Sequence, residues 1–137
     1  MPYKFERLEV WQLAMEYSDM MYALAEQLPS SEDYNLKSQI IRAATSIALN
    51  IAEGSTSQSD AEQARFLGFA IRSLVETVAC QHIAHRRQYL SGPEPLRAAY
   101  RFSEKLFAKL QAFRGTLKAN TIHEETVSYE HDADTPF

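Results

Sequence analysis

The placement of proline is the feature that most limits how this chain folds. Its five prolines stand where long segments begin or end, at Pro2, Pro29, Pro93, Pro95 and Pro136. Proline inside an α-helix costs about 3 kcal/mol, because it removes a hydrogen bond and collides with the preceding turn. The segments between the prolines are rich in Ala, Leu, Glu, Gln and Arg, which favour helix. The sequence therefore predicts long, uninterrupted helices.

The first half of the chain predicts two helices, from about Leu8 to Gln27 and from about Glu32 to Glu53. Apolar residues recur at steps of three and four, which is typical of a helix with one buried face. These residues are Val10, Leu13, Tyr17, Met20 and Leu24 in the first helix and Leu36, Ile40, Ala43, Ile47 and Ile51 in the second. We expect Gly54 to end the second helix in the left-handed conformation that glycine adopts readily.

The second half predicts two further helices. Ser59 followed by Glu62 forms a capping-box pattern, so the third helix should start there and run to Tyr89. The face that we expect it to bury follows a heptad-like step: Leu67, Ala70, Leu74, Thr77, Gln81 and Ala84. The fourth should run from about Pro95 to Lys118. Its apolar positions form the most regular heptad of the chain: Leu96, Ala99, Ser103, Leu106, Leu110, Phe113 and Leu117.

Four helices with apolar faces, joined by short loops, bury those faces only against one another. We therefore predict an all-α fold, an antiparallel up-and-down four-helix bundle over residues 1–118. Residues 119–137 are acidic and lack any apolar period, which predicts a disordered tail.

Composition indicates the compartment in which the protein resides. No apolar run approaches the roughly 20 residues that a membrane-spanning helix needs. The N-terminal residues do not have the pattern of a secretory signal. Cys80 is the single cysteine, which suits a reducing compartment, and we expect a cytoplasmic protein.

Charge is distributed unevenly along the chain. Residues 1–64 carry 4 basic and 10 acidic side chains, residues 65–118 carry 10 basic and 3 acidic, and residues 119–137 carry 5 acidic and no basic ones. The net charge of −4 therefore hides a basic second half. Such segregation suits head-to-tail contacts between copies, with an acidic face against a basic one.

Several motifs resemble one known family. The chain opens with Phe5-x-x-Leu8-x-Val10-Trp11, and its centre reads Arg42-Ala43-Ala44-x-Ser46-Ile47-x-x-Asn50-Ile51-Ala52-Glu53-Gly54. A later stretch reads Phe66-Leu67-x-x-Ala70-x-x-Ser73-Leu74-x-Glu76. Over about residues 3–115 the chain resembles the bacterial four-helix bundle proteins encoded by intervening sequences in 23S rRNA genes.

The resemblance implies a bundle that assembles into a ring-like homopentamer without established catalytic activity. It also implies kinship with the accessory protein of diversity-generating retroelements, a basic pentamer that binds a reverse transcriptase and nucleic acid. The chain departs from the family at Arg72, where glycine is frequent, and in its overall acidic charge.

The motif contains the strongest polar candidates, Asn50 and Glu53. Both lie near the C-terminal end of the second helix, where a carboxylate opposes the helix dipole. We favour a structural hydrogen bond within or between subunits over a ligand site, with Arg42, Gln39 or the first-helix backbone as partners.

The sequence allows two interpretations of Trp11. It either packs with Phe5, Leu8 and Val10 over the end of the bundle or serves as an exposed anchor for a partner. We favour a core or subunit contact, because aromatic residues are mostly buried.

A basic stripe follows the fourth helix, where Arg97, Arg101, Lys105 and Lys109 recur every four residues. Arg86 and Arg87 add charge at the end of the third helix, beside His82 and His85. One interpretation is a surface that follows the phosphates of RNA or DNA. The interpretation that we prefer is a solvated face partly neutralised by the acidic first two helices of the same or a neighbouring chain. A further hypothesis is that the acidic tail folds back over this stripe and competes with nucleic acid.

The sequence contains little that indicates a catalytic site. A metal-dependent bundle enzyme would have to use His82 and His85 with Glu53 and Glu76, but the ligand spacing does not suit zinc or a di-iron centre. Cys80 is expected to be a small buried residue, and no nucleotide-binding or metalloprotease motif occurs. We predict no enzyme and no cofactor. The expected function is that of a homo-oligomeric binding or scaffolding protein, with an RNA- or DNA-binding accessory protein as the alternative.

Overall fold

The computed structural model describes residues 2–119 and 135–137, and these residues form four long helices and two short 3-10 turns. The long helices are α1 (Glu9–Glu26), α2 (Leu36–Gly54), α3 (Asp60–Arg86) and α4 (Glu94–Ala119). The short turns are η1 (Lys4–Arg7) and η2 (Ser30–Glu32). No strand occurs among the described residues, which confirms the predicted all-α class.

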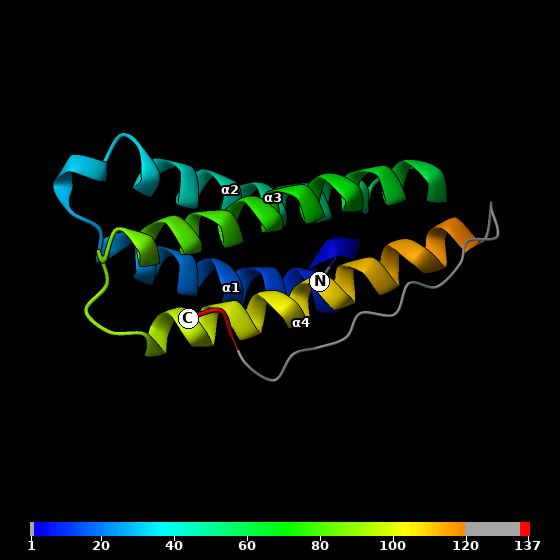
Figure 1. The fold of residues 1–137 in the computed structure, drawn as a ribbon. Helices are drawn as coiled ribbons and strands as arrows, with labels where there is room; N and C mark the ends of the chain where they lie inside the picture. The colour runs from blue at the N-terminus through cyan, green and yellow to red at the C-terminus, as the bar shows by residue number, and fades with distance from the viewer. Residues whose placement is uncertain (1, 120–134) are drawn as a thin grey trace.

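The helices pack side by side along a common long axis (Figure 1). α2 contacts α1 and α3, and α4 contacts α3 and α1, so α1 and α3 lie diagonally across the bundle. Ser46 of α2 contacts Ser73 of α3, whereas Gly54, further along α2, contacts Phe66, earlier in α3. These two helices therefore run in opposite directions, as the short loop between them requires.

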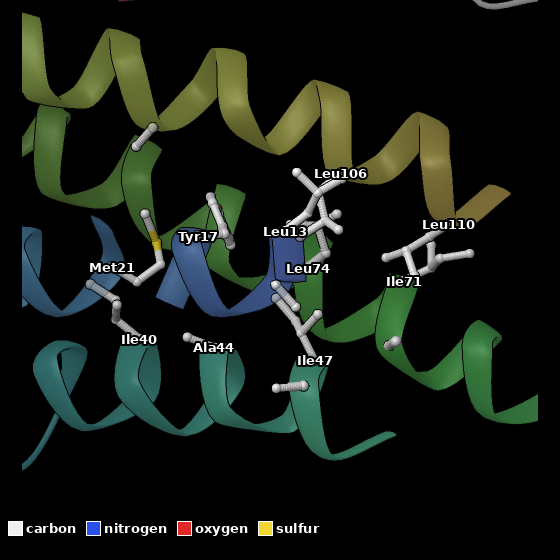
Figure 2. Close-up of a cluster of buried hydrophobic side chains, with 14 of the residues drawn as sticks. Leu13, Tyr17, Met21, Ile40, Ala44, Ile47, Ile71, Leu74, Leu106 and Leu110 are labelled. Carbon is white, nitrogen blue, oxygen red and sulfur yellow. The ribbon is translucent and has the colours of Figure 1, made fainter. Parts of the chain in front are cut away.

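Each helix contributes its apolar face to one core. Tyr17 and Met21 of α1, Ile47 of α2, Leu74 of α3 and Leu106 of α4 are fully buried. Figure 2 shows these side chains pointing toward one another between the four helices. Most core positions follow the predicted apolar stripes, because only those faces remove enough apolar surface from water to stabilise the bundle. In α1, however, Met21 is fully buried, whereas the predicted Met20 is half-buried.

Two helix ends differ from prediction. α2 begins at Leu36 rather than Glu32, because η2 and an irregular Asn35 (φ −130°, ψ −102°) precede it. The side-chain amide of Asn35 donates from Nδ2 to the Glu32 carboxylate at 3.3 Å. Local side-chain bonds of this kind compete with helix formation.

α3 ends at Arg86 rather than Tyr89. Gln88 has a φ of 58°, the Tyr89 amide donates to the Ala84 carbonyl at 3.2 Å, and the Gln88 amide donates to the His85 carbonyl at 3.0 Å. This bond pattern closes a helix with a left-handed residue, a position usually filled by glycine. At the other end, half of the predicted capping box is present: Ser59 Oγ accepts from the Glu62 main-chain amide at 3.2 Å. The Glu62 carboxylate pairs with Arg65 at 3.2 Å.

The prediction for Gly54 was wrong. None of the described glycines has a positive φ, and Gly54 is the last residue of α2 itself. Glycine is needed there for space, because an added Cβ would lie 2.7 Å from Cβ of Phe66 on α3.

Two further predictions concern the chain as a whole. The predicted disordered tail falls largely on residues 120–134, which lie outside the described residues. Over the described ranges, no helix combines the length and apolar character that a membrane span requires.

Candidate functional site

A pocket of about 870 Å³ opens between the end of α3 and the start of α4. His82, His85 and Arg86 line it from α3, and Leu96 and Arg97 line it from α4. The structure thus brings together Arg86 and Arg97, two residues of the predicted basic face that are eleven positions apart in sequence. Apolar Leu96, fully buried, forms part of the wall, so the pocket offers both a cationic and an apolar surface.

Phe137 lies against one side of this pocket and forms part of its lining. Its carbonyl oxygen accepts two hydrogen bonds from the Arg97 guanidinium, from Nε at 3.2 Å and from Nη2 at 3.0 Å. Its ring centroid lies 4.8 Å from that of His82, 5.1 Å from that of His85 and 5.5 Å from that of Tyr100. The acidic charge of the tail raised the hypothesis that it folds back over the basic stripe, but sequence reasoning singled out neither Phe137 nor its ring contacts with His82 and His85. The only sequence signal for these ring contacts was Phe137 itself, an aromatic residue directly after Pro136.

The predicted basic stripe winds around α4. Four residues turn an α-helix by about 400°, so each step moves the next side chain about 40° around the axis. At one end, Arg97 faces the α3 pocket and also pairs with Glu94, Nη1 to Oε1, at 3.0 Å. At the other end, Lys109 Nζ lies 3.4 Å from Glu9 Oε1 on α1. The stripe therefore runs from the α3 side to the α1 side, and both ends are partly neutralised.

The middle of the stripe remains exposed. Arg101 and Lys105 both face solvent, and Lys105 Nζ lies 6.0 Å from the centroid of the Phe102 ring. Arg87 is exposed as well, at the cap of α3. Across residues 2–119 and 135–137, none of these three cations has a carboxylate within ion-pair distance.

A shallow groove of about 400 Å³ follows the outer face of α2. The residues that line it are Arg42, Thr45, Ser46, Leu49, Asn50 and Glu53, most of them from the sequence motif. Asn50 Nδ2 donates to the Ser46 carbonyl at 2.8 Å and to Ser46 Oγ at 3.0 Å. Ser46 Oγ in turn accepts from Ser73 Oγ of α3 at 2.9 Å.

The expected partners of Asn50 were therefore wrong: its amide bonds to Ser46, not to Arg42, Gln39 or the first helix. Four residues separate Asn50 from Ser46, so the two side chains share a face, and the bond reaches α3 only through the serine pair. Arg42 and Glu53 are exposed, and neither forms an ion pair with another described residue.

Trp11 lies at the end of the bundle where η1 folds back on α1. It is half-buried, packs against the core and meets Phe5 edge to face at 4.6 Å between ring centroids. Arg72 lies exposed on α3, so a long charged side chain fits at this position without disturbing the packing within the bundle.

Residues 6–112 match the family model described as 23S rRNA-intervening sequence protein. The match covers well over half of the chain. The protein belongs to this family. Among curated proteins, a search found none that matches the sequence.

This family member also has a buried polar chain that sequence reasoning did not find. Gln81 Nε2 donates to the Tyr17 hydroxyl at 2.7 Å, and the Tyr17 and Thr77 hydroxyl oxygens lie 2.7 Å apart. Thr77 donates to the Leu74 carbonyl at 2.6 Å, so Tyr17 must donate to Thr77. Burial raises the pKa of the Tyr17 hydroxyl well above its usual value. These groups are closed off from solvent and hold helices together.

Cys80 and possible metal ligands are the remaining reactive side chains to place. Cys80 is buried, and burial, with a smaller contribution from the charge of Glu76, raises the pKa of its thiol to about 11. The thiolate, which is the reactive form, is therefore disfavoured at neutral pH. In the part of the chain that the structure describes, no group of three or more His, Cys, Asp or Glu side chains is arranged to hold a metal ion.

Proposed function

We propose that this family member is a non-enzymatic, homo-oligomeric binding or scaffolding protein whose copies meet through the outer faces of α2 and α3. The observation that carries the proposal is the half-exposed state of two apolar side chains there, Leu49 on α2 (52% exposed) and Val75 on α3 (53%). Isolated exposed apolar residues are common on monomers. Here, however, Leu49 lies inside a groove whose rim is polar.

The charges of the groove support contact with a second copy. Arg42 and Glu53 stand near opposite ends of the groove residues and carry opposite signs. Both lack an ion-pair partner among the described residues of their own chain. An apolar centre with a charged rim is the common anatomy of a protein interface. We propose that this α2 face of one copy meets the α3 face of the next copy, which is a head-to-tail contact.

The two halves of the chain support closure into a ring. α1 and α2 belong to the acidic half of the chain, and α3 and α4 belong to the basic half. Head-to-tail contact of unlike faces produces a ring when the rotation between copies closes. We propose five copies, the number that the family resemblance implies, with the remaining outer faces free to bind another macromolecule.

Light scattering during gel filtration at about 10 µM protein and near-physiological salt tests the proposal (both values chosen to favour specific over charge-driven association). The expected mass is near five times the 15.6 kDa of one chain. Leu49→Asp should dissociate the assembly because it buries a carboxylate in the apolar centre. Met15→Asp is the matched control, since Met15 is also a half-exposed apolar residue but lies on α1. A monomeric wild-type protein, or equal loss of mass in both variants, would overturn the proposal.

A second candidate function is binding of RNA or DNA. Arg87, Arg101 and Lys105 favour it, because they are exposed and unpaired among the described residues. Phosphate contacts of this kind supply sequence-independent affinity that weakens with salt. The pairing of Arg97 with Glu94 and of Lys109 with Glu9 leaves only the middle of the α4 stripe unpaired, which is why we place this function second.

A further inference from the structure

The α3–α4 pocket holds Phe137 through both its side chain and its main chain. The ring lies among three other rings, those of His82 and His85 from α3 and of Tyr100 from α4. The carbonyl oxygen accepts two bonds from one guanidinium, that of Arg97. Arg97 is in turn held by Glu94, which bonds to the nitrogen that Phe137 leaves unused. Figure 1 shows these C-terminal residues, in red, beside α4.

We infer that this pocket is a peptide-binding site whose ligand is the segment 135–137 of the same chain. The site recognises an aromatic side chain by ring contacts and the attached carbonyl by a two-pronged hydrogen bond. A further internal bond, from the Phe137 amide to Thr135 Oγ1 at 3.3 Å, turns the segment back on itself and sets the carbonyl toward Arg97.

Charge also suits this ligand. Residues 119–137 carry 5 acidic side chains and no basic one, whereas Arg86 and Arg97 line the pocket and Arg87 lies next in sequence. The site therefore favours an aromatic residue within an acidic segment, which is the composition of this chain's own end region.

Occupation of the pocket has a consequence for the basic stripe. With Phe137 in place, all three nitrogens of the Arg97 guanidinium are engaged, by Phe137 and Glu94. Departure of the segment frees Nε and Nη2, the edge of arginine that binds carboxylate or phosphate in pairs. The segment and any anion that binds Arg97 therefore exclude each other. This inference does not depend on the proposed oligomer.

The test uses the full chain with Phe137→Ala, which removes the ring but keeps the tail. A fluorescein-labelled peptide with the sequence of residues 130–137 is then titrated into this variant and into wild-type protein. A tethered segment competes at an effective concentration in the millimolar range. The peptide should therefore bind the variant at least about tenfold more tightly than it binds wild type, where Phe137 already engages Arg97 and the surrounding rings.

Two controls assign the site. Arg97→Ala added to Phe137→Ala should abolish peptide binding, whereas Arg101→Ala added to the same variant should leave it unchanged, because Arg101 is exposed one turn further along α4. A peptide ending in alanine should not bind. Equal binding by wild type and variant, or binding that survives the loss of Arg97, would overturn the inference.

Proton NMR of the histidine rings tests occupation directly. The ring-proton signals of His82 and His85, assigned with His82→Gln and His85→Gln, should move when Phe137 becomes alanine, because the phenylalanine ring lies about 5 Å away. The wild-type signals should not depend on protein concentration. Unmoved signals in the variant, or wild-type signals that shift on dilution because a neighbouring copy supplies the ring, would contradict an intrachain ligand.

Discussion

The hydroxyl oxygens of Tyr17 on α1 and Thr77 on α3 lie 2.7 Å apart, fully buried at the centre of the bundle. α1 and α3 are the diagonal pair, which have few other contacts with each other. Gln81 donates to the tyrosine and Leu74 accepts from the threonine, so the chain of bonds has one direction. A polar chain of this kind in an apolar core favours one arrangement of the two helices, because any other arrangement leaves its buried groups without partners.

Removal of the Tyr17 hydroxyl should destabilise the bundle. In Tyr17→Phe, the Gln81 amide loses its 2.7 Å acceptor and keeps only the Met21 sulfur at 3.9 Å. A buried group left without a partner costs about 1–3 kcal/mol. Urea unfolding should show the free energy of unfolding lowered by about that amount. Tyr22→Phe is the control, because Tyr22 is 44% exposed on the same helix. Equal stability of the two variants would show that the buried chain contributes nothing.

The same chain predicts a rescue. Replacement of both partners by apolar groups of similar shape is nearly neutral. Tyr17→Phe combined with Gln81→Met should therefore recover much of the stability lost in Tyr17→Phe. The Gln81 Oε1 atom strengthens this expectation, because it is buried without a hydrogen-bond partner among the described residues even in the wild-type protein. A double variant less stable than Tyr17→Phe would contradict the account.

High pH should destabilise the protein through Cys80 and then Tyr17. Burial raises the pKa of the Cys80 thiol from its ordinary 9.0 to about 11, so the unfolded chain loses this proton first. The contribution to stability is therefore fully present below pH 9 and is lost as pH rises to about 11. The pKa of Tyr17 is raised from 10.0, so its contribution falls in the same direction from pH 10 upward.

Unfolding curves across this range measure the effect. Each group lowers the free energy of unfolding by at most about 1.4 kcal/mol per pH unit. Cys80→Ala should show a shallower fall than wild type between pH 9 and 11, whatever its stability at neutral pH. Parallel curves for the two proteins would mean that the thiol titrates alike in the folded and unfolded chains.

Much of the fold was predictable because the apolar positions repeat with the period of a helix. Val10, Ile47, Leu74 and Leu106 were all assigned to buried faces and are buried. Such a pattern reports which face is buried, but not which polar atoms meet inside. Thr77 and Gln81 fell on the predicted apolar face of the third helix, and nothing in the sequence indicated their bonds to Tyr17, which lies sixty or more residues away.

The ends of the helices and the candidate sites were harder to predict than the buried faces, because they do not follow a regular spacing in the sequence. Gln88 ends α3 in a conformation usually reserved for glycine, so composition gave no signal. The four-residue spacing from Arg97 to Lys109 was recognised in the sequence. However, a four-residue step slightly exceeds one helical turn, so over three turns the stripe moves from the α3 side of α4 to the α1 side. The Phe137 contact joins residues forty positions apart and follows no local pattern.

Two glycines should respond oppositely to substitution by alanine. In Gly54→Ala the new Cβ lies 2.7 Å from Cβ of Phe66, so the helices must separate or the backbone must shift. Overpacking of this kind costs about 1–3 kcal/mol. Gly115→Ala places a Cβ on exposed α4 with nothing within 4 Å, and should stabilise the protein by up to about 1 kcal/mol. Thermal unfolding of both variants makes the comparison, and a stabilised Gly54→Ala would contradict the close approach.

The middle of the basic stripe decides between the two candidate functions. If RNA binds there, Arg101→Glu with Lys105→Glu should lower retention of structured RNA on filters by about tenfold or more at low salt, because two phosphate contacts become repulsive. Lys4→Glu with Arg7→Glu makes the same change in net charge on exposed residues of η1, and should have little effect. The wild-type affinity should fall steeply with salt, with a slope of about −0.9 per neutralised phosphate on a logarithmic plot. Loss that is equal in both variants would reflect overall charge rather than a site on α4. If no RNA is retained even at low salt, the stripe is a solvated face. The homo-oligomeric binding or scaffolding role is then the remaining candidate function.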